Sequence, residues 1–100
     1  MNYRFAPEAE AEYLDAIAFY ESRGYRLGAT LIAEFEHAIR LIFERPLAWR
    51  QVHESGIRKL GLARYPYTVF YLPMPDGVQV TAFAHNRQRP LYWFARLGGL

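Results

Sequence analysis

Histidines, arginines and aromatic residues in the second half of the sequence could bind or act on an anionic partner. His53 and His85 could supply the base and the acid of a metal-free RNA cleavage. The cations for the phosphate would be Arg58, Arg64, Arg87 and Arg89. The simpler alternative is that His85 is an ordinary hydrogen-bonded residue at a strand end and that His37 and His53 are structural.

The C-terminal residues combine arginines with aromatic side chains. Arg87 and Arg89 are two positions apart, so in an extended segment they would point the same way. Tyr92, Trp93 and Phe94 follow, and arginine beside aromatic rings can clamp phosphates and stack on bases. The alternative is a C-terminal latch tucked against the sheet. We favour the latch for Trp93 and leave Tyr92 open.

Other familiar chemistries lack their residues. The chain has no cysteine, which excludes a disulfide framework and a cysteine nucleophile. The three histidines, His37, His53 and His85, have no metal-ligand spacing, so no metal site is expected. The glycines never form a phosphate-binding loop, and neither serine has a nucleophile-elbow context. The sequence therefore predicts no metal and no cofactor.

Length and charge describe a small protein with two unlike halves. One hundred residues, 52% of them hydrophobic, predict a single packed domain over residues 1–100. Residues 1–50 carry eight acids and six arginines, a net charge of −2, whereas residues 51–100 carry six bases and two acids, a net charge of +4. The second half is therefore the one expected to face an anionic partner. With no secretory signal pattern and no membrane-spanning apolar run, a cytoplasmic location is expected.

Periodicity predicts a strand, two helices and then three strands. Residues 3–5 form a short strand, and a helix follows from Pro7 to about Arg23. Its apolar face is Ala9, Tyr13, Ala16, Ile17 and Tyr20. The second helix ends at Pro46 and buries Gly28, Leu31, Ile32, Phe35, Ala38, Ile39 and Ile42. Trp49, in the loop that follows, is expected to fill an edge of the core.

The remaining strands have the period of two. Arg58, Leu60, Leu62 and Arg64 share one face of the first, and Lys59 and Gly61 the other. Residues 67–72 are apolar on both faces, as in a central strand, and residues 73–77 form a hairpin loop before a strand over 78–85. The predicted fold is α+β, in the order β-α-α-β-β-β, with a helical hairpin packed on one face of an antiparallel sheet and the other face partly open.

Several local phrases along this framework resemble the RelE/ParE toxins of type II toxin–antitoxin systems, most closely the ParE branch. The phrases are residues 5–9, 27–28, 46–49, 57–60, 65–71 and 85–93, so the resemblance covers nearly the whole chain. It implies a toxin of a plasmid-stabilisation type that arrests growth and is held inactive by a cognate antitoxin in a hetero-oligomer. It places the antitoxin on the helices, and we assign Tyr13, Ile17, Tyr20 and Phe35 to that contact.

The resemblance leaves the target divided between two branches. ParE-like toxins poison DNA gyrase, whereas RelE-like toxins cleave mRNA in the ribosome. Matching positions for a ribonuclease are Arg58, Lys59, His85, Arg87 and Tyr92. Thr68 stands where RelE-like toxins carry an arginine, and losing that cation would weaken stabilisation of the phosphate.

We therefore favour a ParE-like inhibitor of DNA gyrase that is not an enzyme. Its target-binding residues would be Arg58, Arg64, Arg87, Arg89, Tyr92 and Trp93. The alternatives are a ribosome-dependent mRNA endonuclease and an inactive family member that acts only as a binding partner.

Overall fold

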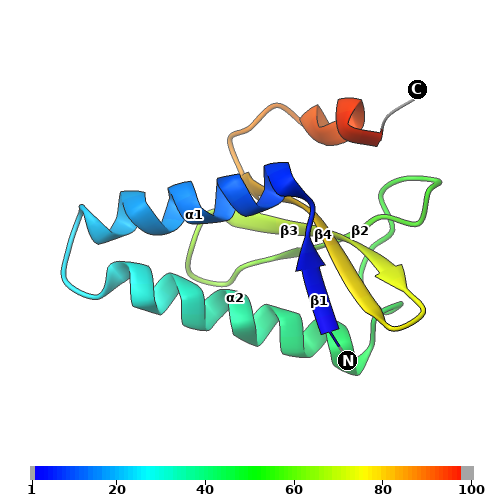
Figure 1. Ribbon diagram of the computed structural model, residues 1–100, viewed down its shortest axis with the longest axis horizontal. Helices are drawn as coiled ribbons and strands as arrows, with labels where there is room; N and C mark the ends of the chain where they lie inside the picture. Colours follow the sequence, from blue (N-terminus) through cyan, green and yellow to red (C-terminus); the bar gives the residue numbers. More distant parts are fainter. Residues whose placement is uncertain (1, 98–100) are drawn as a thin grey trace.

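The computed structural model describes residues 2–97 and has the predicted order of elements (Figure 1). The elements are β1 (Asn2–Phe5), α1 (Pro7–Glu21), α2 (Leu27–Glu44), β2 (Arg58–Gly61), β3 (Tyr67–Met74), β4 (Gly77–His85) and a short 3-10 helix, η1 (Tyr92–Leu97). The expected α+β class is confirmed. Within these residues no helix is long and apolar enough to cross a membrane.

The four strands form one sheet in the order β1-β4-β3-β2. The β2–β3 and β3–β4 pairs are antiparallel, as expected, but β1 runs parallel to β4 and makes the sheet mixed. Parallel neighbours need a long connection, and here the two helices and two strands between β1 and β4 supply it. Sequence patterns do not show the direction of an N-terminal edge strand whose neighbour is the last strand of the chain.

The helical hairpin covers one face of the sheet because each helix has one apolar stripe. In α1, Pro7 occupies the first turn, where its missing N–H costs nothing, and Ala9, Tyr13 and Ala16 are buried. In α2 the predicted stripe is buried except for Ile32, which is 37% exposed because it lies at the edge of that stripe. Helix α1 ends at Glu21, two residues before the predicted end.

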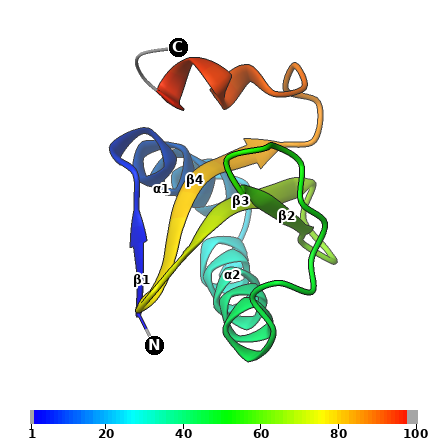
Figure 2. The same cartoon turned by 90° about the vertical axis from the view of Figure 1, so that its right-hand side faces the viewer.

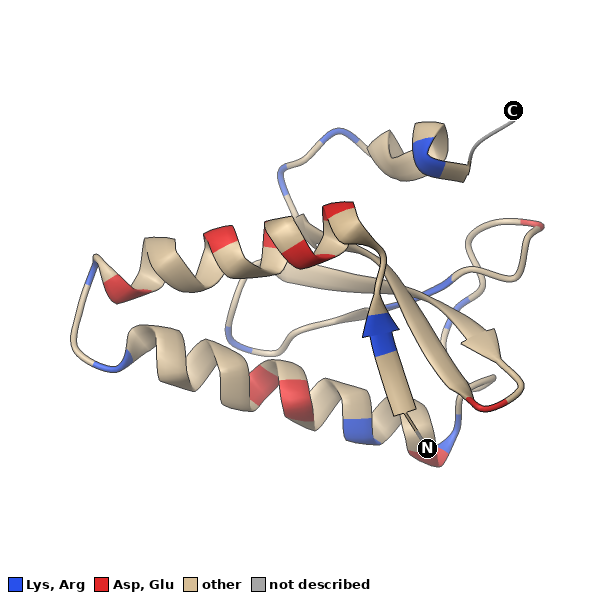
Figure 3. Cartoon of the chain, viewed as in Figure 1, with Lys and Arg blue, Asp and Glu red and all other residues tan. Residues whose placement is uncertain are grey.

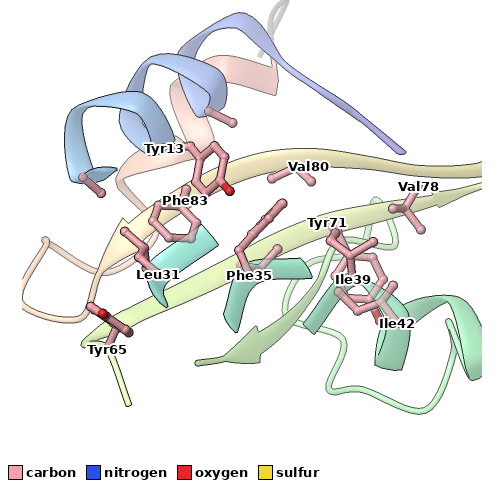
Figure 4. Close-up of a cluster of buried hydrophobic side chains, with 13 residues drawn as sticks. Tyr13, Leu31, Phe35, Ile39, Ile42, Tyr65, Tyr71, Val78, Val80 and Phe83 are labelled. Carbon is pink, nitrogen blue, oxygen red and sulfur yellow. The ribbon is translucent and has the colours of Figure 1, made fainter. Parts of the chain in front are cut away.

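The main core lies between the helices and the sheet and is rich in aromatic rings (Figure 4). The Phe35 ring is fully buried, with its centroid 4.5 Å from that of Tyr13 and 5.8 Å from that of Phe83. Trp49 packs half-buried against this cluster, as predicted.

A second, smaller core lies on the opposite face of the sheet. Trp93 is 0% exposed and packs with Ile57 and Ala82, while the Phe70 ring lies 5.1 Å away. The interpretation of Trp93 as a C-terminal latch is therefore confirmed. Figure 2 shows η1 on the far side of the sheet from α2. The face that we expected to be partly open is thus partly covered by the end of the chain.

Two strand boundaries differ from the prediction. The loop expected over residues 73–77 is a tighter turn at Pro75 and Asp76, because Pro73 and Met74 still pair with β4. Strand β2 ends at Gly61, so Arg64 lies in the following turn and does not extend the face of Arg58 and Leu60.

Candidate functional site

A pocket of about 380 Å³ opens on the sheet face that the helices leave uncovered. We call it the outer-face pocket. It is lined by Lys59, Thr68 and Phe70 from β2 and β3, by His85 from β4, and by Arg89 and Tyr92 from the C-terminal segment (residues 86–97). None of its lining residues, all within the described part of the chain, is acidic. The pocket therefore combines an aromatic floor with cations, which suits an anionic or aromatic group of a partner.

The pocket brings together some of the predicted residues and separates others. Lys59, His85, Arg89, Tyr92 and Trp93 all line it. Arg64 and Arg87 are exposed and do not line it. The sites expected from the sequence are thus only partly assembled at this pocket.

Arg58 does not join Lys59 at the pocket because neighbouring residues of a strand point to opposite faces. Its Nη1 donates hydrogen bonds to the carbonyl oxygens of Leu47 and Trp49, at 3.0 and 2.7 Å. The guanidinium thus fixes the loop between α2 and β2. The prediction that Arg58 contributes to the same active surface as Lys59 and His85 is wrong for this reason.

The segment after β4 is a turn, not the extended chain that was expected. The Gln88 amide donates to the His85 carbonyl oxygen at 2.8 Å, and the Arg87 amide donates to His85 Nδ1 at 3.0 Å. This turn separates the two arginines, and only Arg89 lines the pocket. The expectation that Arg87 and Arg89 point the same way rested on an extended backbone that is absent.

The hydrogen bond to His85 also defines what this imidazole can do. Because Nδ1 accepts the Arg87 N–H, the neutral ring carries its proton on Nε2. The ring packs edge-on against Tyr67, with 5.2 Å between centroids. In this tautomer His85 presents a donor to a partner and has no free lone pair with which to act as a base.

Thr68 lines the pocket at the position where the RelE-like pattern has an arginine. Its hydroxyl donates to the Asn86 side-chain oxygen at 2.8 Å and so helps to hold the turn after β4. A position expected to supply positive charge in a ribonuclease therefore has a structural role here.

Glu12, which the sequence did not single out, holds the C-terminal segment in place. Its carboxylate pairs with Arg96 at 2.7 Å and accepts the hydroxyl proton of Tyr92. Burial raises the pKa of Glu12, but hydrogen bonds from Arg96, Tyr92 and the Phe83 amide outweigh burial, and the pKa is lowered overall. Burial and the bond to Glu12 raise the pKa of the Tyr92 hydroxyl, which is therefore not free to act as an acid.

The Glu12–Arg96 pair also completes an exposed edge of β4. Pairing between β1 and β4 ends at Phe5 and Val80, so the next backbone groups of β4 lack a strand neighbour on that side. Glu12 accepts the Phe83 N–H at 3.1 Å, and Arg96 Nη1 donates to the Thr81 carbonyl oxygen at 3.2 Å. Unpaired backbone groups at such a site are costly, which explains a charged pair there. The only sequence signal for Glu12 was a carboxylate beside the buried stripe of a helix.

A second groove, of about 340 Å³, lies between α1 and the end of β4. Asp15 and Phe19 line its α1 side, and we call it the α1–β4 groove. It shares His85, Gln88 and Tyr92 with the outer-face pocket. The two hollows are therefore separated by a wall that includes Tyr92.

The residues assigned to antitoxin binding differ in their accessibility. Tyr13 and Phe35 are only 8% and 0% exposed, so they pack in the core and cannot contact a partner in this fold. Ile17 and Tyr20 are half-buried. The large apolar side chains that the helical hairpin exposes are Leu14, Phe19, Tyr25, Leu27 and Ile32. Acidic residues are spread along α1, whereas arginines flank the turn after β4 (Figure 3).

The described residues contain no group of three or more histidine, cysteine, aspartate or glutamate side chains placed to hold a metal ion. The chemistry available at the pocket is therefore that of Lys59, His85, Arg89 and the aromatic rings.

The architecture is that of an α+β protein with a helical hairpin on one sheet face and a basic, aromatic pocket on the other. It matches a chain from the structure titled "Chromosomal ParDE TA system from P. aeruginosa", with a TM-score of 0.71 and 16% sequence identity over 85% of this chain and 95% of that chain. The chain thus has the ParE-like fold that the resemblance implied. A scan of protein-family models found no match. A search of curated protein sequences also found none.

Proposed function

We propose that this chain is the toxin of a type II toxin–antitoxin system, of the ParE-like kind, acting in the cytoplasm. The observation that carries the proposal is the shared fold with a chain of a ParDE system, over most of both chains. Because a fold alone does not define an activity, the assignment also draws on the candidate site. A toxin of this kind would be neutralised by a cognate antitoxin in a hetero-oligomer, with the exposed apolar residues of the helical hairpin available for that contact.

The target that we propose is DNA gyrase, bound through the outer-face pocket and the basic turn beside it. Three features make a nuclease less favourable: Arg58 lies on the other face of β2, His85 has no free lone pair, and the Tyr92 hydroxyl is bonded to Glu12. A binding role needs none of these groups to transfer a proton. It needs accessible cations and apolar surface, which Arg87, Arg89 and Leu91 provide.

The second candidate is a ribosome-dependent mRNA endonuclease. It is supported by one observation, that Lys59, His85 and Tyr92 line the same pocket. Under this hypothesis His85→Ala and Lys59→Ala would each lower mRNA cleavage by about 100-fold or more, as loss of an acid–base group does.

The test is charge reversal at the basic turn. The double variant Arg87→Glu/Arg89→Glu should abolish growth arrest and the accumulation of gyrase-cleaved plasmid, while antitoxin binding is retained. The matched control is Arg40→Glu/Arg45→Glu, which reverses two exposed arginines near the end of α2. Unchanged gyrase-dependent cleavage in the first variant would refute the assignment of this surface.

The two targets are distinguished in cells by labelling DNA and protein synthesis minutes after induction without antitoxin. Gyrase poisoning should stop DNA synthesis first, with filamentation and DNA breaks. An earlier stop of protein synthesis would refute gyrase as the target and favour the endonuclease.

A further inference from the structure

Three segments that are distant in the sequence meet at one carboxylate. Glu12 lies on α1, the Phe83 amide on β4, and Tyr92 and Arg96 on η1. These partners are separated from Glu12 by 71 to 84 positions along the chain. Glu12 is therefore the point at which the C-terminal segment is attached to the helical hairpin.

Few other polar contacts hold η1. Among the described residues, every side-chain hydrogen bond from η1 to the rest of the protein ends on Glu12 or on the Thr81 carbonyl oxygen. The bond to Thr81 comes from Arg96, and Glu12 itself orients that guanidinium. The remaining attachment is the packing of Trp93. Loss of the Glu12 carboxylate would thus free most of the polar attachment of η1 at once.

The attached segment forms one wall of the outer-face pocket. Leu91, Tyr92 and Trp93 line the pocket, but Glu12 does not. Leu91 has a φ of 60°, in the left-handed region that leucine rarely adopts. Such a conformation persists only where the surrounding structure holds it, and here it lies just before the residues bonded or packed on both sides of the wall.

We propose that Glu12 is a positioning residue for the target-binding surface: it sets the wall formed by residues 91–93 and thereby the shape of a pocket that it does not line. The consequence for target binding rests on the proposed function. The coupling between Glu12 and the wall does not, since it follows from the contacts themselves.

Glu12→Gln is the informative change because it keeps size and removes acceptors. Each carboxylate oxygen accepts two bonds, Oε1 from the Phe83 amide and Arg96, and Oε2 from Tyr92 and Arg96. In glutamine one of these oxygens becomes an NH₂ group, so a donor must face donors. The matched control is Glu8→Gln, the same substitution at an exposed position of the same helix.

Trp93 can report the position of the wall. The chain has two tryptophans, so Trp49→Phe leaves Trp93 as the only one. In that background Glu12→Gln should shift Trp93 emission to the red and raise its acrylamide quenching several-fold. Amide exchange should accelerate in residues 92–97 while α2, β3 and β4 stay protected. Glu8→Gln should change neither. If Glu12→Gln unfolds the chain as a whole, Tyr92→Phe, which removes one hydroxyl, provides the same test.

The functional measurement is the toxin dose that arrests growth, because it does not depend on which target is correct. Glu12→Gln should raise this dose at least tenfold and leave antitoxin affinity within twofold. Unchanged Trp93 emission and exchange would overturn the proposal whatever the target is. A loosened wall with an unchanged dose would overturn the positioning role. Growth arrest without gyrase cleavage would refute the proposed target alone.

Discussion

Gly77 is the position where the parallel edge of the sheet is most sensitive to one added carbon. A Cβ on Gly77 would lie 1.8 Å from the Asn2 carbonyl oxygen and 2.8 Å from its carbonyl carbon. These are backbone atoms, so no side-chain rotation relieves the contact. Restoring an ordinary separation of 3.4 Å requires a movement of about 1.6 Å between β1 and β4.

That displacement has a calculable effect on stability. Asn2 pairs with Gly77 and Tyr3 with Val78, so a shift at this end weakens the first two steps of the parallel ladder. A lost hydrogen bond costs about 1 kcal/mol, and forced overpacking costs about 1–3 kcal/mol. We expect Gly77→Ala to lower the free energy of unfolding by about 3 kcal/mol, which for a domain of this size lowers Tm by about 10–25 °C.

The assay is thermal and urea unfolding of Gly77→Ala beside Gly61→Ala. Gly61 also lies on a strand, but its added Cβ would meet nothing closer than Thr68 Oγ1, at 3.9 Å. Gly61→Ala should therefore unfold within about 0.5 kcal/mol of the parent chain. Equal stability of the two variants would refute the close approach of β1 to Gly77. Amide exchange in β1 would then show whether the strand pairs with β4 at all.

Two further predictions concern the C-terminal segment. The pKa of Glu12 lies below the ordinary glutamate value of 4.5 because hydrogen bonds from Arg96, Tyr92 and the Phe83 amide outweigh its burial. The stabilisation it gives is therefore present above pH 4.5 and is lost as the pH falls through the lowered pKa. In the Trp49→Phe background, Trp93 emission should shift to the red in that acid range, and the shift should be absent from Glu12→Gln. Leu91→Gly should raise the free energy of unfolding by about 1 kcal/mol, because glycine adopts the φ of 60° without strain and little apolar contact is lost from a 39% exposed side chain. Urea unfolding measures this change, and destabilisation by more than 1 kcal/mol would contradict it.

Local patterns predicted the elements whose burial repeats along the chain. The stripe that contains Leu31, Phe35 and Ile39 marks α2 because its period is that of a helix facing one core. Trp93 could be assigned to a latch because a large apolar residue near a chain end needs a surface to cover. The direction of β1 could not be predicted, since its partner β4 begins more than 70 positions later and the pairing depends on the path between them.

A bulge in β4 explains why alternation failed to predict the two faces of that strand. Phe70 pairs with Ala82 and Tyr71 with Val80, so Thr81 is an extra residue on β4. Straight alternation would place Ala82 with Val80 and turn Phe83 away from the helices. The bulge instead places Phe83 in the main core and Ala82 on the outer face. The small alanine there leaves room for Trp93, so this irregularity allows the C-terminal segment to pack and form the pocket wall.

The pleat of β2 limits the charge that the pocket can offer, and this bears on the choice of target. Arg58 faces the helices and Thr68 is neutral, so Lys59 and Arg89 are the cations among the lining residues, with Arg87 exposed nearby. A protein that binds nucleic acid draws most of its affinity from several phosphate contacts. A protein partner requires fewer charges and gains from buried aromatic and apolar surface. The pocket, with Phe70, Leu91 and Tyr92 around two cations, matches the second requirement better, which favours a protein surface of gyrase over an RNA strand.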